Sequence, residues 1–297
     1  MNSKLSIWLL GDPVGHSMSP AFQNAGLTAL GLPLVYAARR TSPGELVELV
    51  DAIRQGQAVG ANVTLPHKGA MGVLVDRISP SARRAGAINT LVKVAGEVEG
   101  HNTDVPGLLR ALRERDLASG QRAVVLGAGG AARAAVVALD QAGFEFITII
   151  SRDVGRAEIL RGELAPGCCA QLSVVEAARA AEPVAGAPWL GAEVMVHATS
   201  LGVGEVEGDP AFVEAEAVWR ALPWHDLGKL RGVHDMCYGR SETPFLSAAR
   251  AAGVKGGDGL SMLLYQGLES FLMWTGRKPP EAVMRRALEE AAGRPLA

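Results

Sequence analysis

A short polar segment at residues 62–68, Asn-Val-Thr-Leu-Pro-His-Lys, combines side chains that could bind and protonate a small polar ligand. In a β-strand, alternate residues face opposite sides, so Asn62 and Thr64 should point to one face. Pro66 lacks a backbone donor and should end the strand, which leaves Lys68 at the following turn. An amide, a hydroxyl and an amine then meet at the carboxyl end of a strand, where open α/β sheets bind ligands. The alternative is a strand edge with solvated polar groups and a surface lysine.

Further polar clusters follow other predicted strands in the first part of the chain. Ser17 and Ser19 place two hydroxyls one residue apart before a helix, and Asn89 contributes an amide. Thr103 and Asp104 add a hydroxyl and a carboxylate at the start of another helix. Taken singly, Ser19 and Asp104 could be helix caps and Asn89 a turn residue. Taken together with the first segment, these residues favour a ligand site over separate structural roles.

A glycine-rich loop lies between a predicted strand at 122–126 and a predicted helix at 131–142. Gly127 permits the tight turn, Gly129 lets the backbone approach a pyrophosphate, and Ala132 takes the third position of the fingerprint. The helix N-terminus beyond the loop offers unpaired N–H groups to phosphates. A merely structural glycine turn is the alternative. The strand–loop–helix context predicts a dinucleotide site that is formed by Gly127, Ala128, Gly129, Gly130 and Ala131.

The end of the next predicted strand, 146–150, should determine which dinucleotide binds. A protein specific for NAD places an acidic side chain here to hold the ribose hydroxyls. In this chain Ser151 is followed by Arg152 and Arg156, whose guanidinium groups could clamp a 2′-phosphate. Asp153 would repel that phosphate, but we interpret it as the N-cap of the following helix. The segment predicts NADP as the cofactor, bound by Ser151, Arg152 and Arg156, and leaves NAD open.

The composition limits the classes of function. The 297 residues suffice for one large or two ordinary domains, and 48% hydrophobic with 20% charged residues is typical of globular proteins. A formal net charge of −2 provides no basic field for nucleic acid or an anionic membrane. The three cysteines match neither a disulfide framework nor a zinc pattern, so no metal is expected. We therefore expect a cytoplasmic protein that binds a small molecule, with no nucleic-acid or membrane partner.

The order of the elements that must position these residues indicates an α/β protein. The short apolar run in residues 1–10 predicts a buried strand rather than a signal sequence, and no stretch reaches 18 apolar residues. Strands and helices alternate, which implies mainly parallel sheets covered by helices, and a second α/β unit begins after Gly120. The predicted strands are 5–10, 34–38, 59–65, 87–94, 97–101, 122–126, 146–150, 194–197 and 232–235. The predicted helices are 20–30, 44–54, a helix from near Lys68 through 71–74, 104–117, 131–142, a short helix near 174–181, 259–274 and 280–292.

The motifs are similar, in type and order, to those of the shikimate dehydrogenase family. The similarity extends over nearly the whole chain and is therefore highly specific. The matching segments are Gly11–Pro20 (GDPVGHSMSP), Asn62–Lys68 (NVTLPHK), Gly86–Thr90 (GAINT), Asn102–Asp104 (NTD), Gly127–Arg133 (GAGGAAR), Ala198–Ser200 (ATS), Asp235–Tyr238 (DMCY), Thr243–Leu246 (TPFL) and Gly257–Gly267 (GDGLSMLLYQG).

The resemblance implies NADP-dependent, reversible reduction of 3-dehydroshikimate to shikimate in aromatic amino acid biosynthesis. It implies an α/β fold with an N-terminal three-layer substrate domain with a mainly parallel sheet, formed by 1–105 and 258–297. Residues 106–257 would form a Rossmann-type domain that binds NADP. We expect the protein to be a monomer or a homodimer.

The functional residues of the family map onto this chain. Lys68 and Asp104 would form the catalytic acid–base pair, and Ser17 and Ser19 would hold the substrate carboxylate near Tyr238. The remaining substrate contacts would come from Asn62, Thr64, Asn89, Thr103, Asp104 and Gln266. The nicotinamide half of the cofactor would lie along Thr199, Met236 and Gly259.

The chain departs from the family pattern at three places. His197 stands where the family usually has Asn, which would alter the hydrogen bonding of the local loop but not the chemistry. Ser151-Arg152-Asp153 stands where Asn-Arg-Thr is common, which weakens the expectation of strict NADP selectivity. We interpret Cys237, inside the Asp-Met-x-Tyr motif, as a packing residue. One alternative function is a quinate dehydrogenase that uses NAD or both cofactors. Another is a non-catalytic dinucleotide sensor, which would have little reason to keep Lys68 and Asp104 together.

Overall fold

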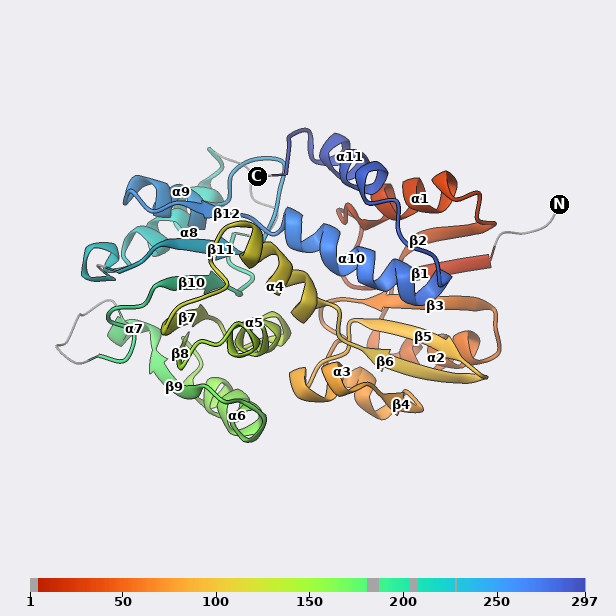
Figure 1. The fold of residues 1–297 in the computed structure, drawn as a ribbon, viewed down its shortest axis with the longest axis horizontal. Coiled ribbons are helices and arrows are strands. Elements are labelled where there is room, and N and C mark those ends of the chain that lie inside the picture. Colours follow the sequence, from red (N-terminus) through yellow and green to blue (C-terminus); the bar gives the residue numbers. More distant parts are fainter. Residues whose placement is uncertain (1–4, 181–186, 203–207, 228, 297) are drawn as a thin grey trace. The chain divides into compact units, whose positions relative to one another are not determined.

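The computed structural model describes residues 5–180, 187–202, 208–227 and 229–296, whose helices and strands are drawn in Figure 1. Contacts divide the chain into two units. The described residues of Met1–Gly107 and Leu263–Leu296 form the first unit, and those of Leu108–Met262 form the second. The division falls inside the helices α4 (Asp104–Glu114) and α10 (Leu260–Thr275).

The first unit is built on a six-stranded sheet in the order β2-β1-β3-β5-β6-β4. β1, β2 and β3 run parallel, and β5 is antiparallel to both of its neighbours, so the sheet is mainly parallel as predicted. Its strands are β1 (Leu5–Gly11), β2 (Leu34–Arg40), β3 (Ala58–Val63), β4 (Arg77–Ile78), β5 (Thr90–Val94) and β6 (Glu97–His101). Its helices are α1 (Ser19–Ala29), η1 (Pro43–Glu45), α2 (Leu46–Arg54), η2 (Ala70–Val73), α3 (Pro80–Ala85) and α11 (Glu281–Ala292), together with the N-terminal turn of α4 and most of α10.

Local sequence signals explain where several of these helices begin and end. Ser42 and Glu45 form a reciprocal capping box at the start of η1, directly ahead of α2. The Ser79 hydroxyl accepts a hydrogen bond from the backbone of Ala82 at 3.2 Å and caps α3. Gly86 ends α3 with a φ of 60°, a left-handed conformation that favours glycine. Apolar side chains of α2 and β3 pack with those of β1, β5 and β6 in one buried core.

The second unit contains six parallel strands in the order β12-β11-β10-β7-β8-β9. This is the 3-2-1-4-5-6 arrangement of a Rossmann-type sheet. The strands are β7 (Arg122–Leu126), β8 (Phe146–Ser151), β9 (Gln171–Glu176), β10 (Val194–His197), β11 (Gly232–Asp235) and β12 (Gly256–Gly257). The helices are α5 (Gly130–Gln141), α6 (Val154–Leu164), η3 (Ala165–Gly167), α7 (Ala177–Ala180), α8 (Pro210–Arg220), η4 (Trp224–Leu227) and α9 (Pro244–Ala251).

The segment after α6 differs from the prediction. A helix was expected near 174–181, but residues 174–176 belong to strand β9, which pairs with β8. Only Ala177–Ala180 is helical, and Ala181 lies outside the described residues. Tertiary pairing with β8 outweighs the alanine-rich local preference for a helix. The helices α8 and α9, which pack on each other, were not predicted at all.

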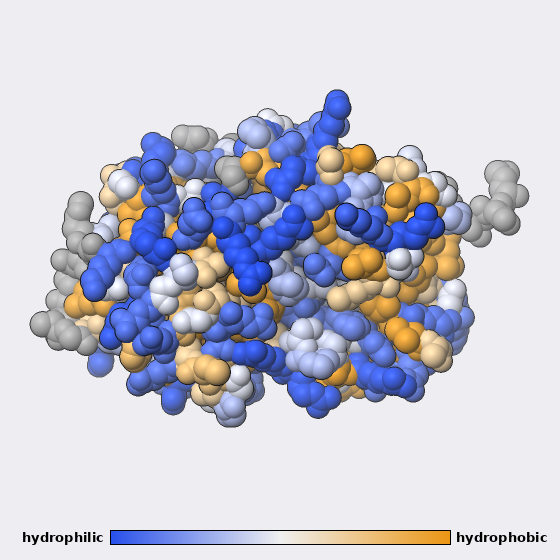
Figure 2. All heavy atoms as spheres, viewed as in Figure 1, coloured by the Kyte–Doolittle hydropathy of each residue, from blue (hydrophilic) through white to orange (hydrophobic). Residues whose placement is uncertain are grey.

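The surface drawn in Figure 2 carries mostly hydrophilic residues with apolar groups scattered among them. None of the helices in the described part of the chain is long and apolar enough to cross a membrane.

His234, on β11, is fully buried, and neither ring nitrogen has a hydrogen-bond partner among the described residues. Burial, with a smaller effect of Arg115, lowers its pKa from 6.5 to about 4, although Asp235 acts in the opposite direction. The unfolded chain therefore binds more protons between these two values, and the free energy of unfolding should fall as pH drops through that window. We expect a loss of about 2 kcal/mol between pH 7 and 5 from this group.

Urea unfolding of wild type and His234→Leu at both pH values measures this contribution. The variant should lack this part of the acid sensitivity, whereas His16→Leu, at an exposed position, should keep it. An identical pH dependence in His234→Leu and wild type would contradict the assignment.

Candidate active site

The side chains of Lys68 and Asp104 meet in the first unit, where Lys68 Nζ donates to Asp104 Oδ2 at 2.6 Å. The pair is largely buried, with exposed fractions of 19% and 7%. Lys68 lies in the turn after β3, but the predicted helix at 71–74 is only the short 3₁₀ turn η2. The turn nevertheless directs the amine to the start of α4, 36 residues along the chain.

Asn89 orients the Asp104 carboxylate. Its Nδ2 donates to Asp104 Oδ1 at 2.8 Å and to Thr103 Oγ1 at 2.9 Å, and its Oδ1 accepts from the Thr103 backbone at 2.7 Å. The N-capping role that was the alternative for Asp104 is wrong, because Asn102 Oδ1 accepts from the backbone of Val105 instead. The carboxylate of Asp104 is thereby left to face the amine.

A buried hydrogen-bond network underlies this pair. Asn62 Nδ2 lies 3.0 Å from Thr90 Oγ1 and 3.1 Å from Ser270 Oγ, and its Oδ1 accepts from the Tyr36 hydroxyl at 2.8 Å. The Ser270 hydroxyl also lies 3.1 Å from that of Thr103. Asn62 is thus held by protein partners, and a contact with substrate would use the remaining lone pair of Oδ1.

Sequence reasoning missed Tyr36, Thr90 and Ser270 as members of this network. Ser270 follows Gln266 by four residues on α10, so both lie on one face of the helix, a spacing that could have indicated it. The Gln266 Oε1 lies 3.4 Å from the Thr103 hydroxyl. No local pattern distinguishes Tyr36 from an ordinary core tyrosine.

The loop between β1 and α1 lies beside the end of β3. A Cβ at Gly11 would lie 2.3 Å from Thr64 Cγ2, which shows how closely the two segments approach. Ser19, predicted as a possible helix cap, is instead the first residue of α1, and its backbone donates to Ser17 Oγ at 3.2 Å. Ser17 is partly exposed and Ser19 is buried. Ser17, Ser19 and Thr64 therefore belong to neighbouring segments of one unit.

The glycine loop of the second unit has the geometry of a phosphate site. Gly127 has a φ of 118°, and a Cβ there would lie 2.8 Å from the Ala198 carbonyl, so only glycine fits. A Cβ at Gly129 would meet no described atom within 4 Å, which leaves open space in front of the loop. Helix α5 begins at Gly130 and lacks a side-chain cap, so its first N–H groups can receive an anion. Ala128 and Ala131 complete the loop.

The end of β8 carries the residues predicted to select the cofactor. Asp153 caps α6, because its Oδ1 accepts from the Arg156 backbone at 2.9 Å, which confirms the interpretation as an N-cap. The Ser151 hydroxyl accepts from the Asp153 backbone at 3.1 Å. Arg152 and Arg156 are exposed, and neither pairs with a carboxylate within the described ranges. Both guanidinium groups can therefore receive a phosphate.

Thr199, Met236 and Gly259 are brought together at the carboxyl edge of the same sheet. A Cβ at Gly127 would lie 3.1 Å from Thr199 Cγ2, and the Gly259 backbone donates to the Cys237 carbonyl at 2.9 Å. Cys237 is buried and its Sγ donates to the Thr199 carbonyl at 3.3 Å, which fits the packing role. Tyr238 lies in this second unit, so a contact with the substrate carboxylate stays a prediction.

The arrangement in the first unit is suited to proton transfer. An ammonium group fixed by a carboxylate can protonate a developing alkoxide, and the amide that holds the carboxylate maintains its direction. The second unit supplies a glycine loop, a helix N-terminus and two exposed guanidinium groups, which suit a phosphorylated dinucleotide. A proton donor and a dinucleotide site together fit hydride-transfer chemistry.

Known proteins resemble this chain in both sequence and structure. Residues 9–91 match the shikimate dehydrogenase substrate binding domain, and residues 259–289 match the shikimate 5′-dehydrogenase C-terminal domain. A protein from Moorella thermoacetica named shikimate dehydrogenase (NADP(+)) is 41% identical over 96% of this chain and 92% of its own.

Two solved structures are similar over nearly their full lengths. Shikimate 5-dehydrogenase from Thermus thermophilus, in complex with NADP(H) and shikimate, has a TM-score of 0.79 and 35% identity over 97% of this chain and 99% of its own. Ligand-free 5-ketofructose reductase from a Gluconobacter strain has a TM-score of 0.80 and 31% identity, over 98% and 99% of the two chains.

Proposed function

The chain belongs to the shikimate dehydrogenase family, and we propose that it catalyses the reversible, NADP-dependent reduction of 3-dehydroshikimate to shikimate. In cells this reaction serves aromatic amino acid biosynthesis. The observation that carries the proposal is the Lys68–Asp104 pair, with Asn89 bonded to the carboxylate. The Moorella relative, which bears the name of this activity, supports it.

Lys68 is the acid–base group of the proposed mechanism. Its ammonium group donates a proton to the oxygen that develops from the substrate carbonyl, and in the reverse direction the amine accepts the proton from the hydroxyl. Asp104 keeps the amine directed at that oxygen and accepts a hydrogen bond from a neighbouring substrate hydroxyl. Asn89 holds Asp104 in place through its own amide. NADPH, when bound, supplies the hydride that this proton complements.

The remaining residues of the first unit bind and orient the substrate. Ser17 and Ser19 hold the carboxylate through their hydroxyls, with Tyr238 from the second unit as a further predicted contact. The other predicted contacts to the ring are Asn62, Thr64, Thr103 and Gln266. We assign residues 1–105 and 258–297 to the substrate domain and residues 106–257 to the cofactor domain.

The proposed cofactor site is formed by residues of the second unit. Gly127, Ala128, Gly129, Gly130 and Ala131 bind the pyrophosphate, and Thr199, Met236 and Gly259 contact the nicotinamide half. Arg152 and Arg156 bind the 2′-phosphate beside Ser151. The open space before Gly129 and the exposed guanidinium groups support this assignment.

Steady-state kinetics over a grid of substrates and cofactors test the proposed function. We expect kcat/KM to be highest for shikimate with NADP. The absorbance of the NADPH produced measures the rate. Quinate is the main competing substrate, and 5-ketofructose with NADPH is included because of the Gluconobacter neighbour. Equal or better turnover of quinate with NAD, or of 5-ketofructose, would replace the proposed substrate.

Two further assignments complete the proposal. The protein works in the cytoplasm as a monomer or a homodimer. The three free cysteines, Cys168, Cys169 and Cys237, are compatible with a reducing compartment.

A further inference from the structure

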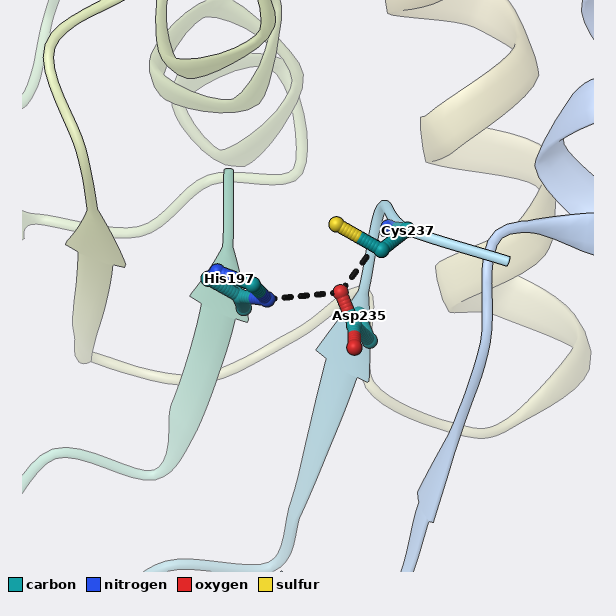
Figure 3. A group of neighbouring side chains, drawn as sticks. All are labelled: His197, Asp235 and Cys237. Carbon is teal, nitrogen blue, oxygen red and sulfur yellow. Dashed lines mark hydrogen bonds and ion pairs between the residues drawn. The ribbon is translucent and has the colours of Figure 1, made fainter. Parts of the chain in front are cut away.

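A largely buried polar network joins the carboxyl ends of β10 and β11 (Figure 3). His197 ends β10 and Asp235 ends β11, and the parallel register places the two residues directly beside each other. The distance between His197 Nδ1 and Asp235 Oδ1 is 2.7 Å, and both side chains have an exposed fraction of zero.

Asp235 determines which ring nitrogen of His197 donates a hydrogen bond. An ionised carboxylate can only accept hydrogen bonds, so Nδ1 of His197 is the donor. Asp235 also accepts from the Cys237 backbone at 2.8 Å and from the Thr243 hydroxyl at 2.6 Å. These three donors fix the carboxylate, and the carboxylate in turn fixes the ring.

Two aromatic side chains hold the imidazole from its remaining sides. The ring centroids of His197 and Trp219 lie 4.5 Å apart in an edge-on arrangement, and those of His197 and Phe245 lie 4.9 Å apart. Because the imidazole is packed in this way, its second nitrogen has a defined direction.

That second nitrogen faces Thr199. His197 Nε2 lies 2.5 Å from Thr199 Oγ1, and this oxygen accepts a hydrogen bond from the Leu201 backbone at 3.1 Å. The Thr199 carbonyl accepts from Cys237 Sγ. The methyl group of Thr199 lies next to Gly127, the first glycine of the phosphate loop. The network therefore fixes a residue at the edge where a Rossmann-type sheet binds its dinucleotide.

We propose that His197, oriented by Asp235, is a positioning residue that holds Thr199 and its loop in the arrangement required for productive binding of the nicotinamide half of the cofactor. The inference rests on the proposed function, because it assigns the network to the cofactor of that reaction. His197 acts through Thr199 and does not itself contact the reacting atoms.

A metal ion is the competing explanation, because His197, Asp235 and Cys237 offer donor atoms within 4.8 Å of one another. His197 Nδ1 is already bonded to Asp235 Oδ1, and His197 Nε2 is already bonded to Thr199 Oγ1. Burial also raises the pKa of the Cys237 thiol well above its usual value, whereas a metal ligand must be a thiolate. These contacts favour the hydrogen-bonded network.

A double-mutant cycle of His197→Leu and Thr199→Val, measured on the whole protein with shikimate and NADP, tests the inference. Each single variant should lower kcat roughly 10- to 100-fold, because misplacement of a bound reactant lowers the rate more than the affinity. The KM for NADP should change less than about threefold, since most cofactor contacts are elsewhere. The double variant should fall no further than the slower single variant, because His197 acts through the Thr199 hydroxyl.

Conservative variants separate positioning from general destabilisation. His197→Asn keeps one donor and one acceptor, and Thr199→Ser keeps the hydroxyl, so both should stay within about fivefold of the wild-type kcat. If His197→Leu does not fold, His197→Phe combined with Thr199→Val provides the cycle, because Phe keeps an aromatic ring against Trp219 and Phe245 but cannot bond to Thr199. Wild-type kcat in His197→Leu, independent losses that multiply in the double variant, or a loss of activity on treatment with EDTA would each overturn the inference.

The proposed function can fail separately from the inference. If wild-type protein does not oxidise shikimate with NADP, the substrate assignment is wrong, and the same cycle is then measured by nicotinamide fluorescence at saturating NADPH, which reports the environment of the bound ring. A changed emission in each single variant, with no further change in the double variant, would support the positioning role, and wild-type emission in both single variants would refute it.

Discussion

Replacement of Lys68 by Ala should lower kcat by roughly 10²–10⁴-fold while KM for shikimate changes much less. The substitution removes the only group for which we propose proton transfer. Asp104 keeps its bond to Asn89, so the carboxylate should stay in place for substrate binding. Steady-state kinetics with saturating NADP measure both constants.

The matched control is Lys278→Ala, which removes an exposed lysine of the same unit. We expect wild-type kinetics from this variant. A Lys68→Ala variant that shows only a raised KM would assign Lys68 to substrate binding and remove it from the proton-transfer step.

Replacement of Arg152 and Arg156 together by Ala should lower kcat/KM for NADP by roughly 10²–10³-fold, because a hydrogen bond to a charged group contributes about 1.5–3 kcal/mol. The value with NAD should change less than about threefold, since NAD lacks the 2′-phosphate. The ratio of kcat/KM for the two cofactors, with shikimate as the fixed substrate, measures the effect.

Arg161→Ala is the control for this prediction. Arg161 lies on the same helix α6 but pairs with Glu158 at 2.6 Å. Its replacement should leave the cofactor ratio unchanged. If the double variant loses activity equally with NADP and NAD, the two arginines do not recognise the 2′-phosphate and their role is structural.

Several parts of the fold and the candidate site follow from local sequence alone. The loop at Gly127–Ala132 could be recognised because each position has a backbone requirement that few residue types satisfy, and the φ of Gly127 bears this out. Asp153 could be interpreted as an N-cap for the same reason, since capping depends on residues three positions apart. The alternation of strands and helices predicted the two mainly parallel sheets.

Local patterns gave the wrong result where partners distant in sequence determine the outcome. Residues 174–176 form a strand because β8 offers an edge for pairing. Asp104 does not cap helix α4, because Lys68 and Asn89 hold its carboxylate. Neither partner can be identified from the residues adjacent to these segments.

The sequence by itself determined the types of chemical group and their order along the chain: a lysine after a strand, a carboxylate at a helix start, a glycine loop and two arginines. Tertiary structure decided which of these groups meet. Asn62 bonds to Ser270 across 208 residues, and His197 reaches Asp235 through the pairing of two strands. Contacts of this kind depend on how sheets and helices pack over long separations, because the direction of a side chain is local but its partner is not.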